Sequence, residues 1–387
     1  MERSASRILT THTGSLPRAP ALVEMMVALS KREPVDEATL EREVVEGSRR
    51  AVLRQLEAGI DIGNDGEQGR ESFFTYVQHR LSGYDGESDR AMPRDIVTFQ
   101  SFVRLKLPEF SRTMVSVLRA PKAVGEVRHT GLGPIEQECA RYARVLGEQE
   151  VGFVESFMTA ASPGIVAAGM LNEHYATYDD YVFAVAEALR PEYEYIASQG
   201  LVLQLDCPDL AMERHISFAD RSLAEFRSFV ETNVEALNRA IAGIPREQVR
   251  LHVCWGNYEG PHHLDVPLDD VLSLLYHANV GALVIPFANP RHAHEWRCLE
   301  RAPLPDGMLL VAGVIDTLTN FVGHPEVVAD RIERVAQAVG DPTRVLAGTD
   351  CGFDTAAGLG QVAEEVVWEK LRALRAGADL ATKRLFG

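Results

Sequence analysis

Eight short runs rich in β-branched and other apolar residues recur along this chain, and amphipathic stretches separate most of them. Within the stretches, apolar residues lie three or four positions apart, as in helices that bury one face. Strands that alternate with helices form a parallel sheet, and eight such units are the number that closes a barrel. We therefore predict an α/β protein with a (β/α)8 TIM barrel. The predicted strands are residues 7–11, 59–62, 154–159, 201–205, 249–253, 282–286, 308–314 and 344–347.

One segment, residues 66–150, interrupts this alternation. It is too long for a single connection from a strand to a helix, and it contains Gly-, Pro- and charge-rich stretches with a predicted hairpin near residues 115–128. We interpret 66–150 as an insertion after the second strand, near the mouth of the barrel, which would serve as a lid or as the contact of a homo-oligomer. Since no second core and no internal repeat is evident, residues 1–387 are predicted to form one domain.

The net charge of the chain limits which classes of molecule it is expected to bind. Lys and Arg number 39 against 56 Asp and Glu, which gives a formal net charge of −17, whereas nucleic-acid binding requires clustered Lys and Arg. No apolar run approaches the roughly 18 residues of a membrane span, and the polar opening is not a signal peptide. The five cysteines show no disulfide spacing. We expect a cytoplasmic protein that acts on a small molecule, with neither nucleic acid nor membrane as a partner.

Polar residues gather at or just after the carboxyl ends of the predicted strands. In a barrel of this type that edge carries the catalytic groups. A random scatter of polar residues would not select one edge of the sheet so often. The residues are Gly14, Ser15, Asp65, Glu67, Asp206, His252, Cys254, Asn289, Asp316, Asp350 and Cys351.

Three of these residues have the chemistry of a zinc site. His252 and Cys254 lie two positions apart on a predicted strand, so their side chains point to the same side, and Cys351 follows the last strand. Two thiolates and one imidazole suit Zn²⁺, and three protein ligands leave a fourth position free for a substrate. The alternative interpretation is two small buried cysteines and a hydrogen-bonded core histidine. The third thiol at a matching strand end favours the metal.

The carboxylates and the first turn suggest how a substrate could be held. Glu67 could bind an ammonium group or carry a proton, although Asp65 and Gly66 also suit an ordinary turn. Asp206 could orient an amine or a hydroxyl. The segment 14–18 offers backbone amides and the cation of Arg18 to an anionic group, although by itself it reads as a Gly-Ser turn.

Several motifs resemble a known superfamily. Five of them, spread from residue 11 to residue 352, resemble the catalytic domain of cobalamin-independent methionine synthase. They read THTGSLPR at 11–18, DGEQ at 65–68, QLD at 204–206, HVC at 252–254 and DCG at 350–352. Two more, NPRH at 289–292 and VIDT at 314–317, look closer to the related epoxyalkane:coenzyme M transferases.

The resemblance implies a barrel with zinc at its mouth, where a substrate thiol binds the metal and is alkylated. His252, Cys254 and Cys351 would be the zinc ligands. The polar end of the thiol would be held by Gly14, Ser15, Glu67 and Asp206. Coordination to zinc deprotonates a thiol, whose pKa is otherwise about 8.5, and keeps it nucleophilic.

Two departures from the superfamily pattern limit what carries over. The family has a glutamate ligand after the sixth strand, where this chain has Pro286 and Phe287, so the predicted site is His/Cys/Cys. The histidine that serves methionine synthase as an acid after the seventh strand is missing from residues 316–320. This second departure puts methylfolate in doubt as the donor.

Three functions remain open on the sequence alone. The leading one is a zinc-dependent thiol alkyltransferase whose thiolate attacks an epoxide or another activated alkyl carbon. Its proton donor would be a water, His12 or Tyr76. The second is methyl transfer to homocysteine from a donor other than the long folate, and the third is a catalytically silent zinc-binding barrel. Glu67 and Asp206 suit the ammonium of homocysteine, whereas the sulfonate of coenzyme M would require a cation. The candidate cations are Arg18, Arg70 and Arg291, and Asn289 is a further candidate for substrate binding.

Overall fold

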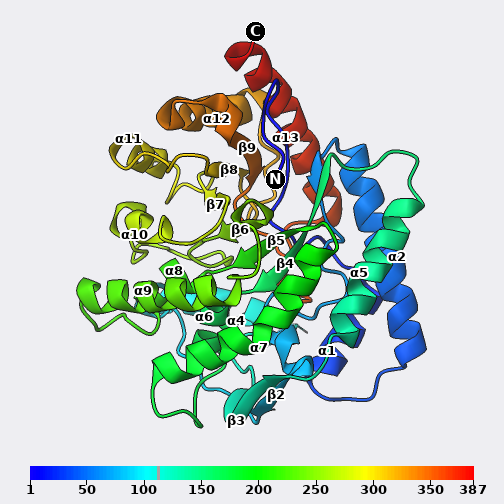
Figure 1. Ribbon diagram of the computed structural model, residues 1–387, viewed down its shortest axis with the longest axis vertical. Coiled ribbons are helices and arrows are strands. Elements are labelled where there is room, and N and C mark those ends of the chain that lie inside the picture. Colours follow the sequence, from blue (N-terminus) through cyan, green and yellow to red (C-terminus); the bar gives the residue numbers. More distant parts are fainter. Residues whose placement is uncertain (111–113) are drawn as a thin grey trace.

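A curled parallel sheet of seven strands forms the centre of the computed structural model, which describes residues 1–110 and 114–387 (Figure 1). Every neighbouring pair of these strands is parallel. In sheet order the strands are β1 (Ile62–Gly63), β4 (Glu155–Ala161), β5 (Val202–Asp206), β6 (Val249–His252), β7 (Ala282–Pro286), β8 (Leu309–Ile315) and β9 (Val345–Thr349).

The two edges of this sheet meet through the start of the chain. Thr10 forms a parallel bridge with Ala347 of β9, and Thr11 forms one with Ile62 of β1. The amide of Thr11 donates to the carbonyl of Ala347 at 2.9 Å, and the amide of Ile62 donates to the carbonyl of Thr10 at 3.0 Å. The first predicted strand, 7–11, therefore lies between β9 and β1, and the arrangement is TIM-barrel-like.

Alternate residues of the strands face two different cores. Leu283 and Ile285 of β7 belong to the large core under the helices, whereas Ala282 and Val284 belong to a smaller cluster with Phe157. This period of two is what a strand buried on both faces requires. The strands are therefore nearly continuous apolar runs, and their polar residues gather at the carboxyl ends.

Helices cover the outside of the sheet (Figure 1). Ser222 and Glu225 form a capping box at the start of α9, and Gly340, with φ of 79°, ends α12 in the left-handed conformation. The α-helices outside the segment 66–132 are α1 (Pro20–Ser30), α2 (Glu37–Glu57), α5 (Gly133–Gly147), α6 (Pro163–Gly169), α7 (Tyr178–Ser198), α8 (Asp209–Met212), α9 (Leu223–Ala240), α10 (Leu268–Leu275), α11 (Cys298–Arg301), α12 (Pro325–Val339) and α13 (Glu364–Leu385). Short 3-10 helices cover Thr75–His79, Glu213–His215, Arg246–Gln248, Glu295–Arg297 and Pro342–Arg344.

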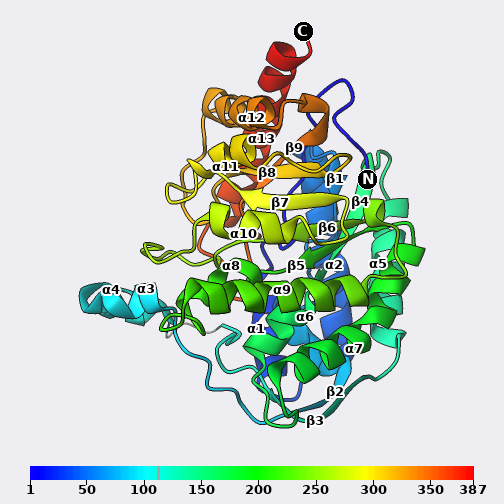
Figure 2. The ribbon, with the colours of Figure 1, turned by 60° about the vertical axis from the view of Figure 1, so that its left-hand side comes forward.

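Between β1 and β4 the chain forms a separate two-stranded sheet. β2 (Leu81–Asp85) pairs antiparallel with β3 (Lys122–His129). The predicted hairpin near residues 115–128 is therefore wrong in its pairing, because the partner of β3 lies well before residue 115. The intervening chain contains α3 (Arg94–Thr98), whose Asp95 accepts hydrogen bonds from Tyr258 and His262, and α4 (Gln100–Phe110), which projects from the side of the molecule (Figure 2).

In the part of the chain that the structure describes, no helix combines the length and the apolar character that crossing a bilayer would require.

Candidate metal centre

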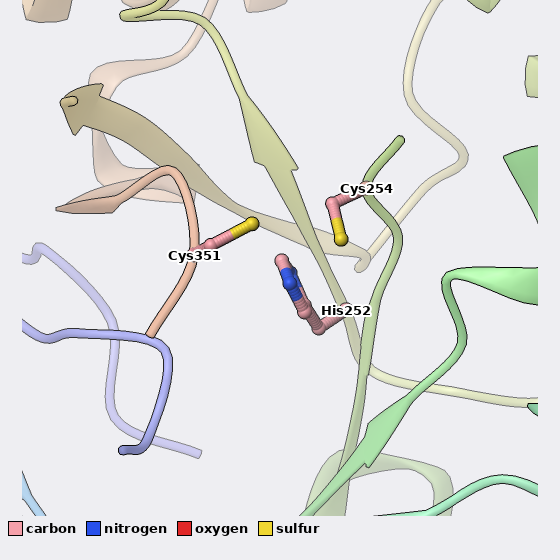
Figure 3. A group of neighbouring side chains, drawn as sticks. All are labelled: His252, Cys254 and Cys351. Carbon is pink, nitrogen blue, oxygen red and sulfur yellow. The ribbon is translucent and has the colours of Figure 1, made fainter. Parts of the chain in front are cut away.

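His252, Cys254 and Cys351 converge on one point, although β6 is the middle strand of the sheet and β9 is an edge strand (Figure 3). His252 is the last residue of β6, Cys254 follows it by two, and Cys351 follows β9 by two. One ligand atom from each side chain lies within 4.8 Å of the other two, and all three residues are buried. The predicted convergence of these three side chains is confirmed.

Hydrogen bonds hold the three side chains in place. Nδ1 of His252 lies 3.3 Å from the carbonyl of Val284, so donation from this nitrogen leaves Nε2 free as a ligand. Nδ2 of Asn257 donates to the carbonyl of Gly352 at 2.9 Å, which ties the loop after Cys254 to the loop after Cys351. Sequence reasoning missed Asn257. Its position three residues after Cys254, at the same strand end, is the signal that could have identified it.

The thiols influence each other before any metal binds. A hydrogen bond from the thiol of Cys351 lowers the pKa of Cys254 well below its usual value, and the charge of His252 acts in the same direction. The same pairing raises the pKa of Cys351. A buried thiolate beside an imidazole carries a negative charge that a bound divalent cation would neutralise. The donor set therefore fits zinc.

No carboxylate takes the position of the missing fourth ligand. Pro286 ends β7 there, and the amide of Phe287 donates to Oδ1 of Asp350 at 3.1 Å. Asp350 also accepts hydrogen bonds from the amides of Ala288 and Asn289, so its oxygens hold the β7 loop. Among residues 1–110 and 114–387, the only group of three or more candidate ligand residues is the His/Cys/Cys set. A substrate thiol could join it without displacing a protein group.

The cavity beside the metal centre has an acidic floor. Its volume is about 300 Å³, and its lining includes the three candidate ligands, Ser15, Glu67 and Asp206. Apolar side chains also line the cavity, and together they are called its apolar wall. They include Phe73, Ile96, Val115, Val117, Met212 and Ile216.

Of the two carboxyl oxygens of Glu67, one accepts a hydrogen bond within the protein and the other does not. Oε1 accepts a hydrogen bond from the hydroxyl of Thr159 at 2.9 Å, whereas Oε2 is buried without a partner. Burial, and then the charge of Asp206, raise the pKa of Glu67 to about 8. Burial raises the pKa of Asp206 to about 6, and Nε2 of Gln204 donates to Asp206 at 2.9 Å. Two partly unpaired acidic groups thus share one cavity.

The backbone around Glu67 is adapted to this position. Glu67 has φ of 57°, in the left-handed region that non-glycine residues rarely adopt, and such residues cluster at functional sites. A Cβ on Gly14 would lie 2.3 Å from Oε1 of Glu67, so only glycine fits there. Gly14 therefore shapes the site by its lack of a side chain.

A second cavity of about 230 Å³ lies on the other side of the cysteines. Its lining includes Cys254, Cys351, Asn289, Arg291 and Asp316. The amide and Nδ2 of Asn289 donate to Asp350, and Nη2 of Arg291 donates to the carbonyl of His263 at 3.2 Å. The polar side chains that follow β7 and β8 thus border this second cavity, and Cys254 and Cys351 line both cavities.

Three of the predicted site residues, Gly14, Arg18 and His12, line neither of these two cavities. Nη1 and Nη2 of Arg18 donate to the carbonyls of Asp354, Glu67 and Arg70, so its guanidinium ties loops together. His12 is buried with Nε2 2.7 Å from Oε1 of Gln55, and burial lowers its pKa to about 4.

Tyr76 and Arg70, which the sequence also suggested as a proton donor and as a cation for the substrate, interact with other residues. The hydroxyl of Tyr76 donates to Glu192 at 3.3 Å, and its ring lies between the guanidinium groups of Arg70 and Arg80. Arg70 itself donates to Glu138 at 2.8 Å and to the carbonyl of Thr159 at 2.7 Å.

The raised pKa of Glu67 should make the stability of the protein depend on pH. The unfolded chain releases this proton near the ordinary pKa of 4.5, whereas the folded protein holds it up to about pH 8. The contribution of the protonated carboxyl to stability is thus complete below the unfolded pKa and is lost as the pH rises through the folded pKa. As the pH rises from about 4.5 to about 8, we expect the free energy of unfolding, measured by urea denaturation, to fall less steeply in Glu67→Gln than in the unsubstituted protein. Equal slopes would contradict this assignment.

Known proteins provide an independent test of the resemblance. The chain is 25% identical to a methionine synthase of Thermococcus kodakarensis over 346 residues, which cover 89% of this chain and 85% of the relative. It is 24% identical to a 2-hydroxypropyl-CoM lyase of Xanthobacter autotrophicus over an alignment covering 92% of this chain and 89% of the relative. The resemblance to the methionine synthase superfamily is confirmed. Both groups named from the motifs are among its relatives, and no family model matches the chain.

The superfamily relation extends to the fold. The structure of a B12-independent methionine synthase from Shewanella, in complex with selenomethionine, superposes with a TM-score of 0.73 at 21% identity, covering 98% of this chain and 99% of the other. A second one, from Listeria monocytogenes, has a TM-score of 0.61 at 19% identity, covering 97% of this chain and 99% of the other. At these identities the likeness concerns the fold alone.

Proposed function

We propose that this protein is a zinc-dependent transferase that moves an alkyl group to a small thiol, with an epoxide or another activated alkyl carbon as the electrophile. The observation that carries the proposal is the group of His252, Cys254 and Cys351 at a buried cavity, with one coordination position free. Relatives named for methionine and for 2-hydroxypropyl-CoM support it, because both compounds are thioethers.

The side chains of the centre suit this chemistry. When bound, zinc would lower the pKa of a substrate thiol and keep the thiolate nucleophilic at neutral pH. The two cysteines would balance the metal charge, while His252 stays neutral because its Nδ1 proton is donated to Val284.

Glu67 is the chain's best proton donor for epoxide opening. It lines the cavity, and its raised pKa of about 8 keeps it protonated at neutral pH. The proton would pass from Glu67 to the oxygen released when its bond to carbon breaks, which gives a hydroxyl on the product and a carboxylate on Glu67. His12 and Tyr76 are outside the cavity lining and are poorer candidates for this role.

A second candidate, methyl transfer to homocysteine, is favoured by the acidic floor. An ammonium group would supply the missing partner of Oε2 of Glu67 and would lie beside Asp206. Binding it would convert Glu67 to its carboxylate, since an adjacent positive charge lowers a carboxyl pKa. In this case Glu67 would hold the substrate and would not donate a proton to it.

X-ray absorption on the zinc-loaded protein tests the proposal. We expect the metal shell to gain one sulfur ligand when homocysteine or coenzyme M is supplied, because three protein ligands leave one position open. The thioether product should then form with a suitable electrophile. A shell that stays the same with every thiol would instead favour a catalytically silent zinc-binding barrel, and a protein that binds no zinc would end both interpretations.

The proposal also includes the architecture around the site. We infer that residues 1–387 form one (β/α)8 barrel domain in which 66–150 is an insertion. The separate sheet of β2 and β3 between β1 and β4 supports this. A lid or homo-oligomer role for the insertion, and a cytoplasmic location, stay predictions.

A further inference from the structure

The cavity beside the metal centre has two chemically different halves. The acidic side chains and the candidate ligands lie on its floor, at the strand ends. The apolar wall is formed by side chains such as Phe73, Ile96, Val117 and Met212. A thiol held by the floor uses only one half, so the wall is available to the second substrate.

The described residues of the cavity lining offer an anionic substrate no Lys or Arg that lacks a carboxylate partner. Among the cavity-lining residues that the structure describes, Arg90 is the only Lys or Arg, and its guanidinium forms a buried ion pair with Glu213. Sulfonates, phosphates and carboxylate chains require unpaired cations or amide donors when they leave water. An uncharged group loses little on entering such a wall and gains from the apolar contact.

The size of the cavity exceeds what the reacting group alone would fill. Its volume of about 300 Å³ is within the range of sites for whole small molecules. A methyl group or an epoxide ring has only one to three heavy atoms at the reacting end. The rest of the space is lined by side chains that favour hydrocarbon.

Most of the apolar wall comes from a different part of the chain than the candidate metal ligands. Phe73, Ile96, Val115 and Val117 all lie between β1 and β4, whereas the ligands lie at or just after the ends of β6 and β9. We propose that these four side chains, together with Met212 and Ile216, form the binding site for an uncharged, apolar, ring-sized or larger group carried by the electrophilic substrate. This inference rests on the proposed function for the identity of the reaction, and it concerns the binding of the second substrate.

A matched pair of probes tests the inference on the full-length protein. 2-Naphthalenemethanol and 2-naphthoate have nearly the same shape and differ in charge. We expect calorimetry on protein freed of zinc with a chelator, where the carboxylate cannot bind the metal, to show that the alcohol binds at least about tenfold more tightly than the carboxylate. We also expect the alcohol to bind protein freed of zinc with a chelator as well as it binds the loaded protein, because the wall does not include the metal.

Two aspartate variants locate the binding site. Val117→Asp places a carboxyl group in the wall and should weaken binding of the alcohol at least about tenfold. Val124→Asp makes the same change on β3 outside the cavity lining, where the residue is 47% exposed, and should leave binding unchanged. Val117→Ile keeps the wall apolar and should bind the alcohol.

Three results would overturn the inference. They are no binding of the alcohol to the folded protein, binding of the carboxylate as tight as that of the alcohol, and unchanged binding in a folded Val117→Asp variant. Tight carboxylate binding would mean that Arg90 receives an anion. If Val117→Asp does not fold, the two probes on the unchanged protein still decide. If the protein has no metal chemistry but still binds the alcohol, only the proposed function is wrong. If the metal site works but the alcohol does not bind, only this inference is wrong.

Discussion

Cys351→Ala is expected to lower zinc affinity by more than the roughly 10- to 100-fold typical of losing a group that only orients a ligand, and to abolish thiol alkylation. The reason is that Cys351 is one of the three residues that form the candidate ligand group in the described part of the chain. Cys254→Ser should behave in the same way, because an alcohol stays protonated at neutral pH. Metal analysis and product formation measure the two effects together.

Cys298→Ala is the matched control for these variants. Cys298 is a buried free cysteine in α11 and is not part of the ligand group. It should keep both zinc and activity. If Cys351→Ala kept full zinc occupancy and normal turnover, the metal centre as described here would be wrong.

Glu67→Gln is expected to weaken the binding of homocysteine by about 30-fold or more, because it removes the charge of one partner in a buried ion pair. Oε2 of Glu67 is buried and unpartnered without substrate, so an ammonium would be its main contact. The size of the effect measures how much of the affinity comes from the charged end of the thiol. Calorimetry on the zinc-loaded variant gives the dissociation constant directly.

4-Mercaptobutyrate, which has no ammonium, is the control ligand for that variant. Its binding should change far less than that of homocysteine, and the zinc content should not change. An equal loss for both thiols would indicate general damage to the cavity. No loss for either would remove the ammonium interpretation, and Glu67 would remain only as a proton donor.

The convergence of the three candidate ligands was predictable because strand geometry favours it. Side chains two apart on a strand point to the same side, and the carboxyl ends of parallel strands meet at one edge, so His252, Cys254 and Cys351 had to approach one another. Asp206, the last residue of β5, reaches the cavity for the same reason. These placements follow from the positions of the residues along the strands.

Residues in loops were less predictable. Arg18 follows a turn in which no periodicity sets the direction of the side chain, and it binds backbone carbonyls instead of facing the cavity. The pairing of β2 with β3 spans the α3–α4 segment, and no local pattern in either strand specifies such a distant partner. The apolar wall likewise depends on how distant segments pack.

The closure of the ring by Thr10 has a consequence for synthesis of the protein. Its bridge partner, Ala347, is synthesised 337 residues after Thr10. Cys351 emerges four residues later, so a nascent chain carries His252 and Cys254 for about a hundred residues before the third ligand arrives. Completion of the ring and completion of the ligand set are therefore late, nearly simultaneous events, and any zinc taken up earlier would be held by two side chains only.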